Sequence, residues 1–69
     1  MKIRSPVTGS IVQICVAVGD AVAVGDEVIL LESMKMEIPV VSEHSGTVSE
    51  ILGQEKLRVQ EDDVLLVLR

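Results

Sequence analysis

Residues 28–41 read Val-Ile-Leu-Leu-Glu-Ser-Met-Lys-Met-Glu-Ile-Pro-Val-Val and lie at the centre of a 69-residue chain. The two ends of this stretch, 28–31 and 38–41, are apolar runs of the kind that form strands. The polar middle predicts a tight turn with Lys35 at its tip. A lysine held there presents an amine to another molecule, and the chain has few other reactive groups. Lys35 is therefore the leading candidate for the functional residue.

The rest of the chain repeats this strand-and-turn pattern. Short β-branched runs are separated by glycine-containing turn signals, and helix periodicity is weak, which predicts an all-β domain. The strands are expected near residues 2–6, 10–16, 21–23, 27–32, 37–41, 47–52, 57–59 and 64–68.

The two halves of the chain also resemble each other. Residues 8–14 align with 45–51 at an offset of 37, and 26–30 align with 62–66 at an offset of 36, which predicts a one-residue slip near 53–56. Neither four-stranded half can bury its apolar face alone. Packing the halves face to face gives two four-stranded antiparallel sheets with pseudo-two-fold symmetry, a flattened β-barrel or sandwich of the barrel-sandwich hybrid type.

This arrangement predicts a single domain over residues 1–69. The turn at 32–37 would lie at one pole, and the two chain termini would lie at the other. Pro39 falls inside a predicted strand and cannot donate to its ladder, so it is expected at a sheet edge or a bulge, where it would stiffen the hairpin. Turns that need positive φ are expected at all five glycines, 9, 19, 25, 46 and 53.

Composition argues against several classes of partner. The formal net charge is −5 and the six basic residues are scattered, so neither nucleic acid nor a membrane is an expected partner. The chain has no Phe, Tyr or Trp, which removes the usual aromatic anchors of binding surfaces. No apolar run approaches the roughly 20 residues of a membrane helix, and no signal-peptide pattern is present. We expect a cytoplasmic protein that is a monomer in isolation.

The other reactive side chains form no catalytic or metal-binding cluster. Cys15, the single cysteine, has apolar neighbours and is expected in or near the core as an unreactive residue. His44 has no partners at ligand spacing and is expected in an exposed loop. The acidic run at 61–63 is expected to be a solvated turn rather than a metal site. No catalytic triad can be assembled from these residues.

Residues 32–36, Glu-Ser-Met-Lys-Met, resemble the attachment motif Glu-Ala-Met-Lys-Met of the biotinyl branch of the biotinyl/lipoyl attachment domain family. Residues 19–26, Gly-Asp-x-Val-x-x-Gly-Asp, and 45–48, Ser-Gly-Thr-Val, also match the family. The resemblance extends from about Ile3 to Leu68 and is strongest to the small free-standing members. Two departures are the serine within the motif and the loss, in the second half, of the expected Gly-Asp pairs, which leaves the turn geometry there open.

The resemblance implies that Lys35 carries biotin in amide linkage and that the chain is a biotin carboxyl carrier. Such a carrier is not itself catalytic. It moves a carboxyl group between the biotin carboxylase and carboxyltransferase sites of a biotin-dependent carboxylase, whose acceptor is an acyl-CoA or an oxo acid. The implied partners are those two subunits and the biotin protein ligase that attaches the cofactor.

The chemistry of the lysine suits this role. An ordinary lysine amine has a pKa of about 10.4 and is almost wholly protonated at neutral pH. We therefore expect Lys35 to accept an activated acyl group inside a ligase rather than to act as a base. The modified arm would reach on the order of 12–15 Å at standard bond lengths.

Met34 and Met36 flank the lysine and have two interpretations of equal weight. Their polarizable side chains suit recognition by a partner pocket, or they cover the end of the core. Strand alternation predicts both on one side, opposite Lys35. The main alternative function is a lipoyl carrier, with lipoate on Lys35, in a 2-oxo-acid dehydrogenase or glycine-cleavage system. An unmodified module that uses the hairpin only for docking is the other.

Overall fold

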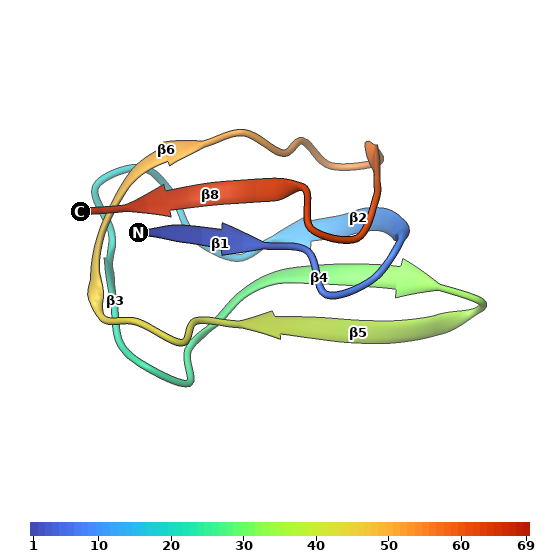
Figure 1. The fold of residues 1–69 in the computed structure, drawn as a ribbon, viewed down its shortest axis with the longest axis horizontal. Coiled ribbons are helices and arrows are strands. Elements are labelled where there is room, and N and C mark those ends of the chain that lie inside the picture. The colour runs from blue at the N-terminus through green and yellow to red at the C-terminus, as the bar shows by residue number, and fades with distance from the viewer.

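The computed structural model describes all of residues 1–69 and consists of eight β-strands (Figure 1). The all-β prediction is confirmed, and the ends of each strand lie within two residues of the expected positions. No helix of the length and hydrophobicity needed to cross a membrane is present. The strands are β1 (Lys2–Arg4), β2 (Gly9–Ile14), β3 (Ala21–Val22), β4 (Glu27–Ser33), β5 (Met36–Val41), β6 (Gly46–Ile51), β7 (Arg58–Val59) and β8 (Val64–Leu68).

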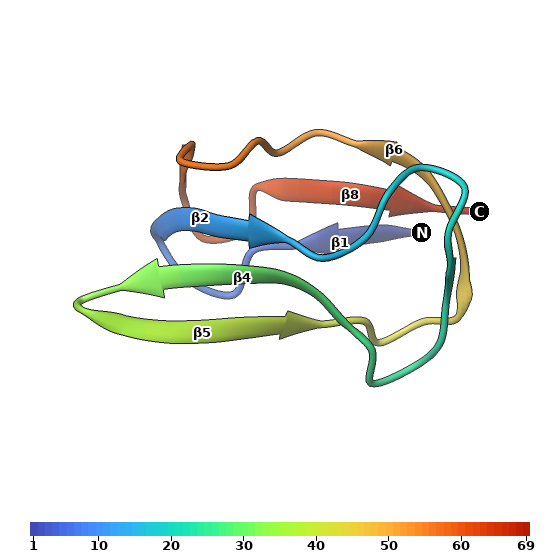
Figure 2. The same cartoon turned by 180° about the vertical axis from the view of Figure 1, so that it is seen from behind.

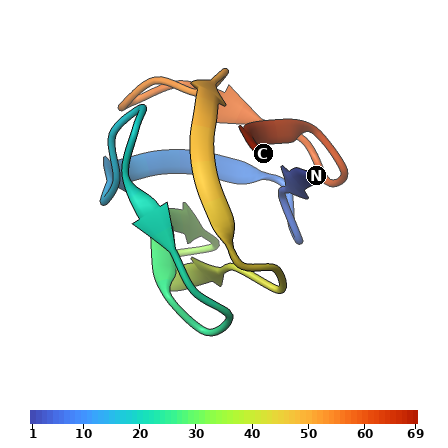
Figure 3. The same cartoon turned by 90° about the vertical axis from the view of Figure 1, so that its left-hand side faces the viewer.

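The strands form two four-stranded antiparallel sheets, ordered β1-β8-β6-β3 and β5-β4-β2-β7. Figure 2 shows the second sheet from its outer side, with β4 between β5 and β2. Seen along the long axis, the strands wrap around a shared interior (Figure 3). The longest dimension of the molecule is 31 Å; the β4–β5 hairpin protrudes at one end of it, and both termini lie at the other (Figure 1). The predicted barrel-sandwich hybrid and its two poles are confirmed.

A single offset of 37 residues relates the two halves throughout. It maps β1, β2, β3 and β4 onto β5, β6, β7 and β8, and it converts one sheet order into the other. The predicted one-residue slip is wrong. The doublet Asp62-Asp63 offers two ways to align Asp26, and the hydrogen bonds select Asp63, since both Asp26 and Asp63 accept a bond from the amide three residues before them.

The core has the same two-fold relation. It contains twelve buried apolar side chains, all Val, Ile or Leu, and each one in the first half has its counterpart 37 residues later. Burying one such side chain stabilises the fold by about 1.5–3 kcal/mol relative to its exposure, so this shared cluster is the main stabilising element of a small chain. The pairs are Ile3 and Val40, Ile11 and Val48, Val22 and Val59, Val28 and Leu65, Ile29 and Leu66, and Leu31 and Leu68.

Backbone hydrogen bonds tie the halves together reciprocally. The amide of Ser5 donates to the carbonyl of Asp63 at 2.8 Å, and the amide of Ser42 donates to the carbonyl of Asp26 at 2.9 Å. Both serines are buried, and each hydroxyl donates to the carbonyl two residues further on. Because the two amide bonds of Ser5 and Ser42 each join one half to the other, neither half contains a complete hydrogen-bonding pattern by itself.

Four equivalent turns, at 17–20, 23–26, 54–57 and 60–63, connect the short strands. In each one the fourth amide donates to the first carbonyl at 3.0–3.1 Å. The second-half turns, left open by the sequence, therefore keep the geometry of the first half without its glycines. The third residue always has positive φ: Gly19 97°, Gly25 91°, Lys56 70° and Asp62 74°.

The expectation of positive φ at every glycine is wrong for three of the five, Gly9, Gly46 and Gly53. These glycines instead lie where neighbouring atoms leave no room for a Cβ. At Gly9 the obstacle is the backbone carbonyl oxygen of Glu32 on β4, and at Gly46 it is the carbonyl oxygen of Arg69, 2.7 Å from the position that a Cβ would occupy. The two glycines are equivalent under the two-fold relation, so close strand approach explains both.

The substitution Gly9→Ala is expected to lower the free energy of unfolding by about 1–3 kcal/mol, because the added methyl collides with backbone in the middle of a sheet. Gly46→Ala is the matched control and is expected to cost less, since the carbonyl oxygen in its way lies farther from the added Cβ than the one at Gly9. Urea unfolding of both variants measures the difference. Equal losses would contradict this account.

A second test concerns the left-handed turns. Lys56→Gly is expected to raise the free energy of unfolding by up to about 1 kcal/mol. Glycine avoids the roughly 1–2 kcal/mol that a side chain costs at positive φ, but it also gives the unfolded chain more conformational entropy, which offsets part of the gain. Gly19→Ala, at the equivalent position, is expected to lower it by about 1–2 kcal/mol. Thermal or urea unfolding checks both signs; a loss of stability in the Lys56 variant would contradict the strain assigned to it.

Candidate functional site

The β4–β5 hairpin ends in a two-residue turn formed by Met34 and Lys35, with Ser33 paired to Met36 at its base. The φ angles are 51° at Met34 and 64° at Lys35. Positive φ at both central residues is the requirement of the type I′ turn, which matches the twist of the two strands that it joins. Lys35 therefore lies at the extreme tip of the hairpin, at the pole farthest from the termini (Figure 1).

The turn is strained by its residue types. Type I′ turns are usually built from Asn and Gly, whereas this one places two long side chains at positive φ. Each such residue costs on the order of 1–2 kcal/mol, and costs of this kind concentrate at functional sites. Beyond a register shift between Glu27 and Ile29, the β4–β5 pairing runs without a break from Ile29 opposite Val40 to Ser33 opposite Met36, and it holds the turn in this conformation.

Both methionines are exposed. The side chain of Met34 is 91% exposed and that of Met36 is 64% exposed, so neither covers the end of the core. The packing interpretation is therefore wrong for both residues. The prediction that strand alternation places both methionines opposite Lys35 also fails. Met34 and Lys35 form the turn, and side chains alternate between faces only within a strand.

The amine of Lys35 is exposed and takes part in none of the side-chain hydrogen bonds of the chain. Below it, Glu32 and Glu37 face each other across the hairpin in register. Two like charges at opposed positions are unfavourable for the sheet and make this end of the hairpin acidic. The amine therefore projects beyond an acidic base, with nothing in the chain covering it.

Neighbouring segments support the hairpin. The hydroxyl of Ser33 donates to the carbonyl of Thr8 at 2.8 Å, so the serine that replaces the usual alanine ties the tip to the loop before β2. Gly9 follows, and its missing side chain allows β2 to approach the Glu32 carbonyl. Pro39 lies on β5, which is an edge strand, as predicted.

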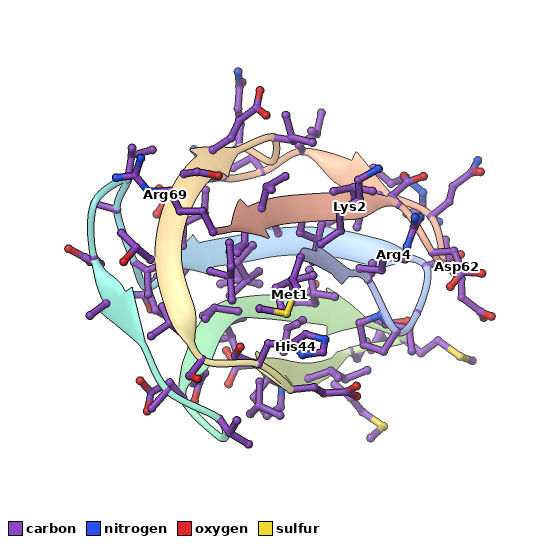
Figure 4. The ribbon with its side chains drawn as sticks, turned by 60° about the vertical axis from the view of Figure 1, so that its left-hand side comes forward. Met1, Lys2, Arg4, His44, Asp62 and Arg69 are labelled. Carbon is purple, nitrogen blue, oxygen red and sulfur yellow. The ribbon has the colours of Figure 1, made fainter.

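The other residues singled out by the sequence lie away from the tip or in turns. His44 is exposed in the loop after β5, as expected, and the acidic run 61–63 forms one of the four turns. The guanidinium of Arg4 donates to the carbonyl of Asp62 in this turn at 3.0 Å (Figure 4). Cys15 lies directly after the end of β2 and is exposed rather than in the core, which corrects the expectation. Desolvation, and then the nearby Glu27 carboxylate, raise the pKa of its thiol.

An open depression of about 520 Å³ lies beside the tip and was not anticipated from the sequence. Its lining includes Ser33 and Met34 of the hairpin, Thr8 and Ser10 beside them, and Arg58 of β7. Thr8, Ser10 and Arg58 are more than 20 residues from the tip in sequence. Only the correct strand order and register bring them to it.

The family model described as "Biotin-requiring enzyme" matches residues 1–68. The chain belongs to this biotin/lipoyl family. The geometry agrees with the family resemblance seen in residues 32–36, since the structure places that motif on an exposed turn at the end of the molecule.

Individual proteins similar to this chain support the same family. The chain is 44% identical over 68 residues to the biotin/lipoyl attachment protein of Bacillus subtilis, covering 99% of this chain and 93% of that one. It is 36% identical over 66 residues to a biotinylated protein TB7.3 homologue of Mycobacterium leprae, covering 96% and 93%. The crystal structure of the Kluyveromyces lactis urea carboxylase matches with a TM-score of 0.93 at 36% identity, covering 100% of this chain and 6% of that protein.

Truncating the exposed methionine tests its role in stability. Met34→Ala is expected to leave the free energy of unfolding within about 0.5 kcal/mol of the parent value, as for an exposed residue without packing contacts. Leu31→Ala, three residues earlier and fully buried on β4, is the control and is expected to cost about 2–5 kcal/mol. A loss of 2 kcal/mol or more in the Met34 variant would restore the packing interpretation.

Proposed function

We propose that this chain is a biotin carboxyl carrier in which biotin is joined to Nζ of Lys35 through an amide bond. The carrier is not catalytic; it transfers a carboxyl group between the biotin carboxylase and carboxyltransferase sites of a biotin-dependent carboxylase with an acyl-CoA or oxo-acid acceptor. The observation that carries the proposal is a Met-Lys-Met motif on an exposed, strained two-residue turn at the pole opposite the termini. Family membership and the biotinylated relative support it.

The residues present fit an amide-linked cofactor. Lys35 supplies a primary amine that takes part in none of the side-chain hydrogen bonds of the chain, so a ligase can take it up, remove its proton and join it to an activated acyl group. When bound, biotin supplies a ureido nitrogen that carries the carboxyl group. The exposed side chains of Met34 and Met36 give a ligase or carboxylase two adaptable apolar contacts on either side of the amine.

The shape of the molecule favours a tethered carrier. The hairpin projects the amine from one end of a 31 Å body, and the termini lie at the other end (Figure 1). An arm on the order of 12–15 Å can enter an active site while the domain stays outside. Tethering also raises the effective concentration of the carried group near the sites that use it.

A lipoyl carrier is the second candidate, because the Bacillus subtilis relative is named for both cofactors. The same exposed amine suits lipoate, and the partner would then be a 2-oxo-acid dehydrogenase or a glycine-cleavage system. The Met-Lys-Met sequence favours biotin. In either case we propose that the 69 residues act as one cytoplasmic carrier domain, monomeric in isolation, whose partners include the attaching ligase.

Expression in cells that contain both biotin and lipoate ligases tests the function. The intact mass is expected to show one biotinyl group, and the protein is expected to bind streptavidin. Lys35→Arg is expected to lose both signals, because arginine offers no acylable amine. Lys56→Arg is the matched control, an exposed lysine at the same pole, and is expected to keep both.

Each outcome discriminates between the candidates. A lipoyl adduct on Lys35 would replace the biotin proposal with the second candidate. No adduct of either kind would contradict both and favour an unmodified docking module. An adduct that persists in the Lys35 variant would overturn the assignment of the site.

A further inference from the structure

The depression beside the tip contains a row of three polar residues on three neighbouring strands. Ser10 on β2 is paired with Glu32 on β4 and, on its other side, with Arg58 on β7. Residues opposite one another in a sheet point to the same face, and the exposure of Glu32 and Arg58 shows that this face is the outer one. The row therefore presents a carboxylate, a hydroxyl and a guanidinium side by side, one residue away from the turn that holds Lys35.

The two charged ends of this row are not engaged with each other. None of the side-chain hydrogen bonds of the chain involves the carboxylate of Glu32 or the guanidinium of Arg58. Their strands are separated by β2, which places their backbones about 10 Å apart. A hydrogen-bond acceptor and a fork of donors are thus both available on opposite sides of a small, partly buried serine.

The fold does not require these side chains. Under the 37-residue relation the row Glu32–Ser10–Arg58 corresponds to Arg69–Thr47–Ala21 at the other pole, and Thr47 is indeed paired with both Ala21 and Arg69. The same backbone therefore tolerates alanine in place of the guanidinium and a cation in place of the carboxylate. The carboxylate–hydroxyl–guanidinium combination occurs only at the pole with the attachment lysine.

We propose that this row is a docking site for a cyclic urea, the head group of biotin on Lys35, so that the arm rests against its own domain between reactions. A ureido N–H donates to a carboxylate, and a ureido carbonyl accepts from a guanidinium, which matches the two ends of the row. The depression, about 520 Å³, lies within the usual range for small-molecule sites. An arm on the order of 12–15 Å spans the distance from the tip to the row.

The inference rests on the proposed biotin carrier function and is tested with the ¹⁵N-labelled protein, unmodified and biotinylated. Backbone amides of Ser10 and of β7 are expected to change chemical shift on biotinylation, in addition to those of the turn itself. Arg58→Gln is expected to lose the changes at Ser10 and β7, because it removes the cationic donor fork. Lys56→Gln makes the same charge change at this pole but outside the depression, and is expected to keep them.

Two results separate failure of the inference from failure of the function. Biotin attached at Lys35, as shown by intact mass, with shift changes confined to residues 33–36 would overturn the docking site and leave the carrier function intact. Retention of the Ser10 and β7 changes in the Arg58 variant would also overturn it. Absence of any biotin adduct would overturn the proposed function, and the docking site with it.

Discussion

The mutual burial of two apolar sheet faces is the constraint on which this structure depends. Each half of the chain contributes six aliphatic side chains to one core, and each side chain has a counterpart 37 residues away. Neither half could bury this surface alone, and a chain of this length has little other material for a core. The reciprocal hydrogen bonds, such as those of Ser5 and Ser42, hold the halves in one relative position. The paired core thus fixes both poles of the molecule.

The symmetric body supports an asymmetric function. The buried apolar positions are alike in the two halves, whereas exposed positions such as Arg58 and its counterpart Ala21 can differ. Under the same relation, the chain termini at the other pole take the place of the hairpin turn (Figure 1). Strain at Met34 and Lys35 is offset by the β4–β5 ladder and by the hydrogen bond from Ser33 to Thr8. In the proposed carrier, a rigid base therefore displays a mobile arm.

The internal symmetry also explains where the sequence was misread. Glycine was expected to mean positive φ, yet at Gly9 and Gly46 it permits close approach of a strand to a carbonyl oxygen. Conversely, Lys56 and Asp62 adopt positive φ without glycine, because the surrounding hydrogen bonds impose the turn. The sign of φ at these turns therefore follows the position of a residue in the 37-residue repeat more closely than its residue type.

The sequence by itself determined the eight strands, the pairing of two similar halves and the placement of Lys35 at a hairpin tip, because aliphatic runs, turn residues and the attachment motif are local signals. Only the tertiary structure decided the strict 37-residue register, the exposure of Met34 and Met36, and the row Glu32–Ser10–Arg58. The register and the row depend on strand order, and the exposure of the methionines depends on which residues form the turn rather than the strands. Such relations join residues far apart in the chain, and no local pattern encodes them.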